Sequence, residues 1–261
     1  MKKAIGVVSL ALLLMTAACS NNSSTSSAGS TSTINVFAAA SLTDAFTKIG
    51  DDYQAANAGT KVIFNFGSST DLATSIGSEG TADVFASASG AAMDTVQSAP
   101  GVSDRQNFAT NSLVIITPPD NPANIQSIKD LGNPGVKLVL AADSVPVGDY
   151  AREALKNAGV SNAAMKNVVS NESDDAATVA KVTSGDADAA IVYTSDVAAA
   201  TGNQVHSVPI EDQYQVIATY PIAVVTGGAN ATGASSFVAY VMGSAGQTTL
   251  RTFGFGPPPT S

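Results

Sequence analysis

The stretch "INVFAAASLTDAF", residues 34 to 46, decides the fold. Its apolar residues predict a short strand that ends in small side chains, and a helical pattern follows Ser41. A serine with an acid three residues later is typical of a capped helix N-terminus, here Ser41 with Asp44. The same spacing recurs at Ser68 and Asp71. The stretch therefore predicts a strand that turns into a helix at a corner of small and hydroxyl-bearing residues.

This plan of strand, corner and helix recurs along the chain. Three segments of the first half are echoed in the same order in the second half: 34–46 by 136–151, 62–76 by 167–182, and 81–94 by 186–200. Alternating strands and helices of this length favour a mostly parallel sheet with helices on both faces. The repeat predicts two α/β units of like build.

Two further strand patterns join the repeated units. They lie at 111–117 and 219–226, and we interpret them as crossovers between two lobes. The predicted first lobe comprises 33–111 and 220–261, and the second comprises 112–219. The predicted architecture is a two-lobed α/β fold whose sheets are joined by two hinge crossovers.

The first residues have the pattern of an export signal. Two lysines precede an apolar run that ends at Ala18, which predicts a signal peptide over 1–18. Cys19, the single cysteine, follows directly and resembles the lipidated cysteine of a bacterial lipobox. Residues 19–32 are rich in serine and threonine and are expected to form a flexible tether. These features predict a protein held by lipid at the outer face of a membrane.

The charge balance limits the classes of ligand. From Cys19 onward, 10 basic residues face 21 acidic ones, which gives a net charge of −11. A chain this negative is a poor partner for nucleic acid. It also provides no general attraction for anions, so an anion site would depend on local dipoles. No pattern that indicates an oligomer is present, and we expect a monomer.

Such dipoles are expected at four predicted helix starts, after Ser41, Ser69, Val147 and Asp175. Ligands of open parallel sheets bind outside the carboxyl ends of the strands, where all four corners would lie. A helix start presents unpaired N–H groups and a partial positive charge. Together these corners predict an oxyanion site.

The parts needed for other chemistry are missing from the sequence. None of the three arginines, Arg105, Arg152 and Arg251, stands at a predicted corner, so a guanidinium clamp is not indicated. With one histidine, one cysteine and no G-x-S-x-G turn, metal sites and nucleophile triads lack their usual residues. A hydrolase or transferase that uses Ser41 or Ser69 is a competing hypothesis, but neither serine has a neighbouring base.

Several motifs together give a resemblance to a known family. They are "VFAAASLTDAF", "FGSSTDLA", "ADVFASA", "NSLVII", "VPVGDYA", "AIVYTSD" and "YPIAVV". In this order, from Ile34 to Phe255, they resemble the molybdate-binding component of ABC importers, a type II solute-binding protein. The resemblance implies a receptor that holds molybdate or tungstate between two lobes and delivers it to an ABC permease. It implies no enzymatic activity, no cofactor and no metal site apart from the oxyanion.

The resemblance also implies the residues that hold the ion. Ser41 and Ser69 would each give a backbone N–H and a hydroxyl, Val147 and Asp175 a backbone N–H, and Tyr193 its phenol. These would be uncharged donors, as suits an ion that carries no proton at neutral pH.

Asp175 departs from the family pattern, which has an apolar residue at this place, and Asp174 is the alternative for the same position. An inward carboxylate would repel a dianion and would accept a hydrogen bond from a protonated ion such as phosphate. A sulfate or phosphate receptor of the same fold therefore stays open as the alternative function.

Overall fold

The computed structural model describes residues 32–199 and 204–259. The predicted signal peptide and Cys19 lie outside these residues, as does all but the last residue of the predicted tether. No helix in the described ranges is both long and apolar enough to cross a membrane.

The first of two sheets holds five strands. Its spatial order is β2 (Thr60–Gly67), β1 (Ser32–Ala39), β3 (Val84–Ala86), β10 (Ala218–Val225) and β4 (Val102–Asn111). Strands β2, β1 and β3 are parallel, and β10 runs antiparallel to both β3 and β4. The helices around this sheet are α1 (Thr43–Ala56), α2 (Ser69–Glu79), α3 (Gly90–Ser98), α8 (Ala231–Met242) and α9 (Ser244–Thr252).

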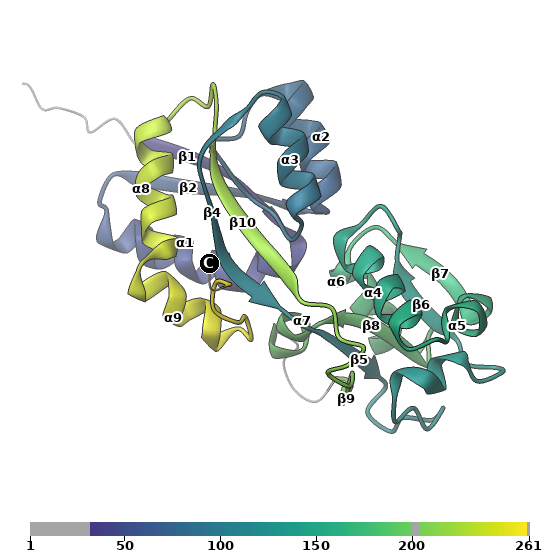
Figure 1. The fold of residues 1–261 in the computed structure, drawn as a ribbon. Coiled ribbons are helices and arrows are strands. Elements are labelled where there is room, and N and C mark those ends of the chain that lie inside the picture. Colours follow the sequence, from purple (N-terminus) through teal and green to yellow (C-terminus); the bar gives the residue numbers. More distant parts are fainter. Residues whose placement is uncertain (1–31, 200–203, 260–261) are drawn as a thin grey trace, which may run out of the picture. The chain divides into compact units, whose positions relative to one another are not determined.

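Helices cover both faces of the first sheet (Figure 1). Side chains of β1 alternate between the two faces, as the pleat of a strand requires. Val36 belongs to the same core cluster as Phe46 of α1, and Phe37 to the same cluster as Leu72 of α2. Phe46 also lies against Phe108, with ring centroids 5.7 Å apart. Both faces of β1 are therefore buried against helices.

The second sheet also mixes parallel and antiparallel strands. Its order is β7 (Val168–Glu172), β6 (Leu138–Ala141), β8 (Ala189–Tyr193), β5 (Leu113–Thr117) and β9 (His206–Pro209). The helical elements around it are η2 (Ile128–Gly132), α4 (Pro146–Asn157), α5 (Ser161–Asn167), α6 (Asp175–Thr183) and α7 (Thr194–Ala199). Strand β6 is parallel to β7 and β8, whereas β5 is antiparallel to β8 and β9.

The predicted fold class of two α/β sheets flanked by helices is confirmed. The chain passes from the first sheet to the second between Asn111 and Leu113, and it returns between Pro209 and Ala218. The strands on either side of these crossovers, β4, β5 and β10, make antiparallel pairs. Each sheet is therefore mixed, where the sequence predicted a mostly parallel one.

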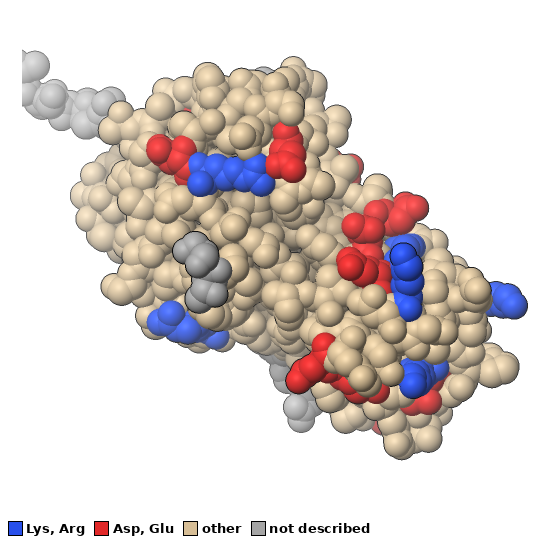
Figure 2. All heavy atoms as spheres, viewed as in Figure 1, with Lys and Arg blue, Asp and Glu red and all other residues tan. Residues whose placement is uncertain are grey.

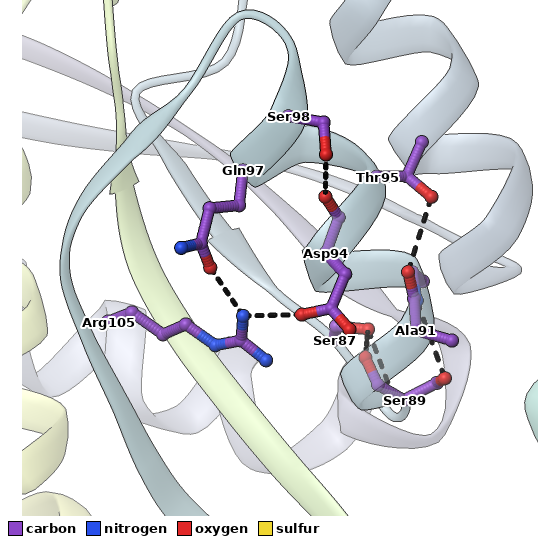
Figure 3. Close-up of polar contacts among 9 residues, drawn as sticks. Ser87, Ser89, Ala91, Asp94, Thr95, Gln97, Ser98 and Arg105 are labelled. Atoms are coloured by element: carbon purple, nitrogen blue, oxygen red, sulfur yellow. Dashed lines mark hydrogen bonds and ion pairs between the residues drawn. The ribbon is translucent and has the colours of Figure 1, made fainter.

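Asp83 ties the strand β1 to the start of α8. Its buried carboxylate accepts hydrogen bonds from the backbone N–H of Asn35 and from that of Asn230, both at 2.7 Å. Asp94 makes a contrasting contact at the surface, where Arg105 of β4 donates to it at 2.6 Å and also to Gln97 (Figure 3). The Asp94 side chain is 67% exposed, so solvent screens this pair.

We expect Asp83→Ala to lower the free energy of unfolding by about 2 to 4 kcal/mol, because two buried N–H groups lose their acceptor. Asp94→Ala, the matched control, should cost no more than about 1 kcal/mol. Urea denaturation of both variants measures the difference. Equal losses would contradict the role assigned to Asp83.

Candidate functional site

A small cavity lies where corners of both sheets meet, and we call it the corner pocket. Its lining residues come from segments far apart in the sequence: Ala39, Ala40, Ser41, Gly67, Ser68, Ser69, Ala88, Val145, Pro146, Val147, Asp175 and Tyr193. The cavity volume is about 10 Å³, close to the smallest space that holds one water molecule. The corner pocket is therefore suited to one compact ligand.

The structure brings together all five residues that the resemblance singled out. Ser41 and Ser69 approach the corner pocket from the first sheet, and Val147, Asp175 and Tyr193 approach it from the second. Ser69, Val147, Asp175 and Tyr193 are each less than 5% exposed. No cluster of three His, Cys, Asp or Glu side chains with metal-site geometry occurs in the described ranges.

Three α-helices begin at the corner pocket. The first residues of α2 and α6 line it, as do Pro146 and Val147 at the start of α4. The first N–H groups of each helix have no partner within the helix and carry its positive dipole end. Three such ends around one cavity favour a negatively charged ligand.

The predicted serine caps are wrong in their detail. A 3₁₀ turn, η1 (Ala40–Leu42), separates β1 from α1, and neither Leu42 nor Ser68 caps the helix that follows through its side chain. Ser41 Oγ instead lies 2.9 Å from Tyr220 Oη. Ser41 therefore contacts β10 and does not cap α1, and the hydroxyl of Ser68 does not cap α2.

Three buried polar atoms of the corner pocket have no hydrogen-bond partner among the described residues. They are Ser68 Oγ, Tyr193 Oη and Asp175 Oδ2. An unpaired buried polar atom costs a few kcal/mol, so native proteins seldom keep three at one place. Burial raises the pKa of Tyr193 well above its ordinary value, so its hydroxyl stays a donor. The corner pocket is thus incomplete without a polar ligand.

Ser69 can also donate into the corner pocket. Its Oγ accepts a hydrogen bond from the backbone N–H of Ala88 at 3.0 Å, so its own hydrogen remains free to donate. Ser68, the residue before it, was not among the predicted site residues. The only signal for Ser68 was its place in the same serine-rich corner.

The structure separates the two neighbouring acids at the start of α6. Asp174 is the N-cap, and its carboxylate accepts from the backbone N–H of Ala177 at 2.7 Å. Asp175 lines the corner pocket and lies beside Asp196 of α7. Burial of the carboxyl group raises the pKa of Asp175 to about 6. The neighbouring Asp196 and nearby backbone N–H groups lower this pKa, but by less.

Asp196 has its own constraints. Its carboxylate accepts from the backbone N–H of Tyr193 at 2.8 Å. Burial of the carboxyl group raises the pKa of Asp196 well above its ordinary range, and the charge of Asp175 raises it further. Two desolvated carboxyls in contact cannot both be ionised cheaply. Ionisation of Asp175 therefore works against ionisation of Asp196.

The arginines stay outside the corner pocket. Arg105 is occupied by Asp94 and Gln97 (Figure 3), and Arg251 bonds Thr248 within α9. Arg152 does stand at a corner, contrary to the sequence-based expectation, because it donates to the carbonyls of Ala141 and Gly148. It supports the turn from β6 into α4 but does not line the cavity.

Gly148 explains how α4 approaches β6 so closely. A Cβ at this position would collide with the carbonyl oxygens of Ala141 and Ala142. The glycine allows the first turn of α4 to lie on the end of the strand, which brings Val147 to the cavity.

Figure 2 shows basic and acidic side chains side by side on a mostly uncharged surface. Local N–H dipoles, and not a field of basic residues, define this site.

A larger hollow adjoins the corner pocket, and we call it the outer hollow. It has a volume of about 370 Å³ and shares Ala40, Ser41 and Asp175 with the corner pocket. Asp44 and Asp196 also line it. The carboxyl pair thus stands between the two spaces.

A chain of hydrogen bonds leads from the corner pocket to the crossovers. Tyr220 of β10, which contacts Ser41, accepts from Asn111 Nδ2 at 3.3 Å. Asn111 Nδ2 also donates to Ser195 Oγ at 2.8 Å, and Thr194 donates to Asn111 Oδ1 at 2.8 Å. This hinge chain, formed by Ser41, Tyr220, Asn111, Thr194 and Ser195, joins the two sheets beside the site.

Comparison with known proteins supports the class of protein that this geometry indicates. A family described as bacterial extracellular solute-binding protein matches residues 34–256. The molybdate-binding protein ModA of Mycobacterium tuberculosis H37Rv is 40% identical over 227 residues, which cover 87% of this chain and 85% of that protein. The chain belongs to the bacterial extracellular solute-binding protein family and is a transport receptor, not an enzyme.

Solved structures show the same fold. The periplasmic molybdate-binding protein of Azotobacter vinelandii gives a TM-score of 0.74 at 18% identity, covering 87% of this chain and all of that one (100%). The sulfate-binding protein SubI of M. tuberculosis gives 0.78 at 17% identity, covering 87% of each chain. These likenesses agree with the fold of two sheets flanked by helices, which is the fold of type II solute-binding proteins.

The buried carboxyl of Asp175 should make stability depend on pH. Without oxyanions, the free energy of unfolding should fall as pH rises from about 4 to 7, because the native state holds this proton more tightly than the unfolded chain, where the ordinary pKa is 3.8. In the wild-type protein this fall in the free energy of unfolding should be on the order of 3 kcal/mol, and it should be absent in the Asp175→Asn variant. Urea denaturation at a series of pH values measures it.

Asp51→Asn, on the exposed side of α1, is the control and should follow the wild-type curve. Parallel curves for the wild-type protein and Asp175→Asn would show that the Asp175 carboxyl ionises in the native state without penalty.

Proposed function

We propose that this protein is the extracytoplasmic receptor of an ABC importer and that it captures molybdate or tungstate in the corner pocket. The observation that carries the proposal is the set of unpartnered polar atoms, Ser68 Oγ, Tyr193 Oη and Asp175 Oδ2, at three helix N-termini. The 40% identity to a molybdate-binding protein supports the choice of ion. After capture, the receptor delivers the ion to the membrane permease.

The ligand is selected by hydrogen-bond type and by size. Molybdate and tungstate carry no proton at neutral pH, so each oxygen only accepts hydrogen bonds. The N–H groups of the helix starts and the hydroxyls of Ser41, Ser69 and Tyr193 only need to donate. A cavity that two sheets close around one ion then separates molybdate and tungstate from the smaller sulfate.

The proposal treats the two sheets as two lobes, 33–111 with 220–261 and 112–219, which close about the crossovers. Thr70 of α2 donates to the backbone carbonyl of Ser144, before α4, at 2.7 Å. This contact joins a residue of the first proposed lobe to one of the second beside the corner pocket. It supports a closed arrangement in which both lobes hold one ion.

We further propose that residues 1–18 are a cleaved signal peptide and that lipid on Cys19 anchors a monomer through the 19–32 tether. The sequence pattern supports this placement, and so does membership of an extracellular family. Cys19→Ser should move the protein from the membrane fraction to the soluble fraction of lysed cells. Equal amounts of wild-type protein and variant in the membrane fraction would contradict the lipid anchor.

A second candidate function is a sulfate or phosphate receptor. The Asp175 carboxyl favours the phosphate case, because an ionised carboxylate in the corner pocket would accept a hydrogen bond from hydrogen phosphate. The fold itself does not decide, because the SubI structure shares it.

Thermal unfolding of the purified protein with each oxyanion distinguishes these functions. Molybdate and tungstate should raise the melting temperature clearly, while sulfate and phosphate should do little. A rise with phosphate or sulfate alone would favour the second candidate.

Tyr193→Phe and Ser68→Ala should each weaken molybdate binding about 10- to 100-fold, the loss of one hydrogen bond to a charged ligand. Neither change removes a hydrogen bond that the described structure shows, so the unliganded fold should keep its stability. Tyr53→Phe is the control, because its hydroxyl bonds Ser236 away from the corner pocket. Titration calorimetry measures the affinities, and unchanged affinity in both pocket variants would discredit this site.

A further inference from the structure

The carboxyl pair of Asp175 and Asp196 is the feature of the site that the proposed function does not explain. Asp175 is 4% exposed, and its Oδ2 has no partner among the described residues. It lies beside Asp196, whose carboxylate accepts a hydrogen bond from the backbone N–H of Tyr193. Asp175 lines both the corner pocket and the outer hollow. A receptor for dianions thus places an acid directly at its ligand.

The groups that face this pair do not supply a balancing positive charge. On α6 itself Asp174 adds a negative charge, and across the outer hollow Asp44 of α1 is another acid. Tyr193 of β8 and Tyr220 of β10 face the pair with neutral phenols. No Lys, Arg or His is among the residues that line either space. Only backbone N–H groups of α6 and β8 oppose the charge of the pair.

A dianion that enters the corner pocket would meet the ionised form of Asp175 at contact distance in a desolvated site. Such repulsion is strong where water does not screen it. A proton on Asp175 removes the repulsion and turns Oδ2 from an orphan acceptor into an O–H donor.

We propose that Asp175 takes up a proton when the corner pocket fills, and that it then donates a hydrogen bond to the bound dianion. This inference rests on the proposed function. It makes Asp175 a residue that determines specificity, since a protonated carboxyl favours ligands with free acceptor oxygens. The proton comes from solvent and is released again when the ion leaves.

The size of the pH effect on affinity depends on the fraction of unliganded protein in which Asp175 is protonated. With its pKa at about 6, Asp175 is about half protonated at pH 6 and about 1% protonated at pH 8. The apparent affinity for molybdate is proportional to the fraction of protein in which Asp175 is protonated. Molybdate should therefore bind on the order of 10- to 100-fold more weakly at pH 8 than at pH 6, although the ion stays a dianion across this range.

Titration calorimetry of the full wild-type protein with molybdate tests this directly. At pH 7.5, two buffers of different ionisation enthalpy, free of phosphate and sulfate, should give heats that differ by the uptake of close to one proton per ion. Affinities at pH 6 and pH 8 should differ by the factor above. Tungstate should behave in the same way.

Asp175→Asn provides the matched variant. Its amide is a permanent donor of similar shape, so binding should become independent of pH between 6 and 8, with no proton uptake, and should be tighter than wild type at pH 8. Asp44→Asn, an exposed acid of the same outer hollow, is the control and should keep the wild-type pH dependence.

The outcomes separate this inference from the function on which it rests. Molybdate binding of equal strength at pH 6 and pH 8, or binding with no net proton uptake, overturns the role of Asp175 and leaves the receptor function intact. Binding of neither molybdate nor tungstate at either pH overturns the proposed function and this inference with it. A pH dependence that Asp175→Asn retains would also overturn it.

Discussion

The unpaired backbone N–H groups at the starts of α2, α4 and α6 are the constraint on which the structure depends. The first N–H groups of each helix need a hydrogen-bond acceptor. The protein has many more acidic than basic residues, so few basic side chains are available to bind an anion. Bringing three such ends to one cavity makes neutral peptide groups into an anion site. The small residues at the corners, such as Gly148 behind Val147, allow these amides to come close. Each of these three helices follows a strand, so the convergence places the ends of β2, β6 and β7 near the cavity.

Much of this arrangement could be predicted from the sequence, because its signals are local. A strand that runs through small residues into a serine and a helix identifies a corner on its own, and its recurrence indicates two units. Ser41, Ser69, Val147 and Asp175 were placed at corners for that reason, and the structure gathers them with Tyr193 around one cavity. Their contact with an ion remains a prediction.

What could not be predicted depends on packing between distant segments. Ser68 and Ser69 are alike in sequence, and only the twist at the end of β2 decides which hydroxyl meets Ala88 and which has no partner. Asp196 belongs to a helix start like many others, and its contact with Asp175 arises because α7 packs beside α6. Strand β4 was missed because half of its residues are exposed and its sequence gives no apolar alternation.

The hinge chain gives the site a mechanical property. Ser41, Tyr220 and Asn111 lie on the side of the first sheet, and Asn111 is bonded to Thr194 and Ser195 of α7, so a rotation of one sheet against the other alters the bonds between Asn111 and α7. Separating the sheets far enough to free an ion strains or breaks these bonds. The proposed release of an ion would therefore be resisted partly by Asn111, Thr194 and Ser195, which do not line the corner pocket. Substitutions at the crossovers would then change mainly the residence time of the ion, whereas substitutions at the corners would change mainly its equilibrium affinity.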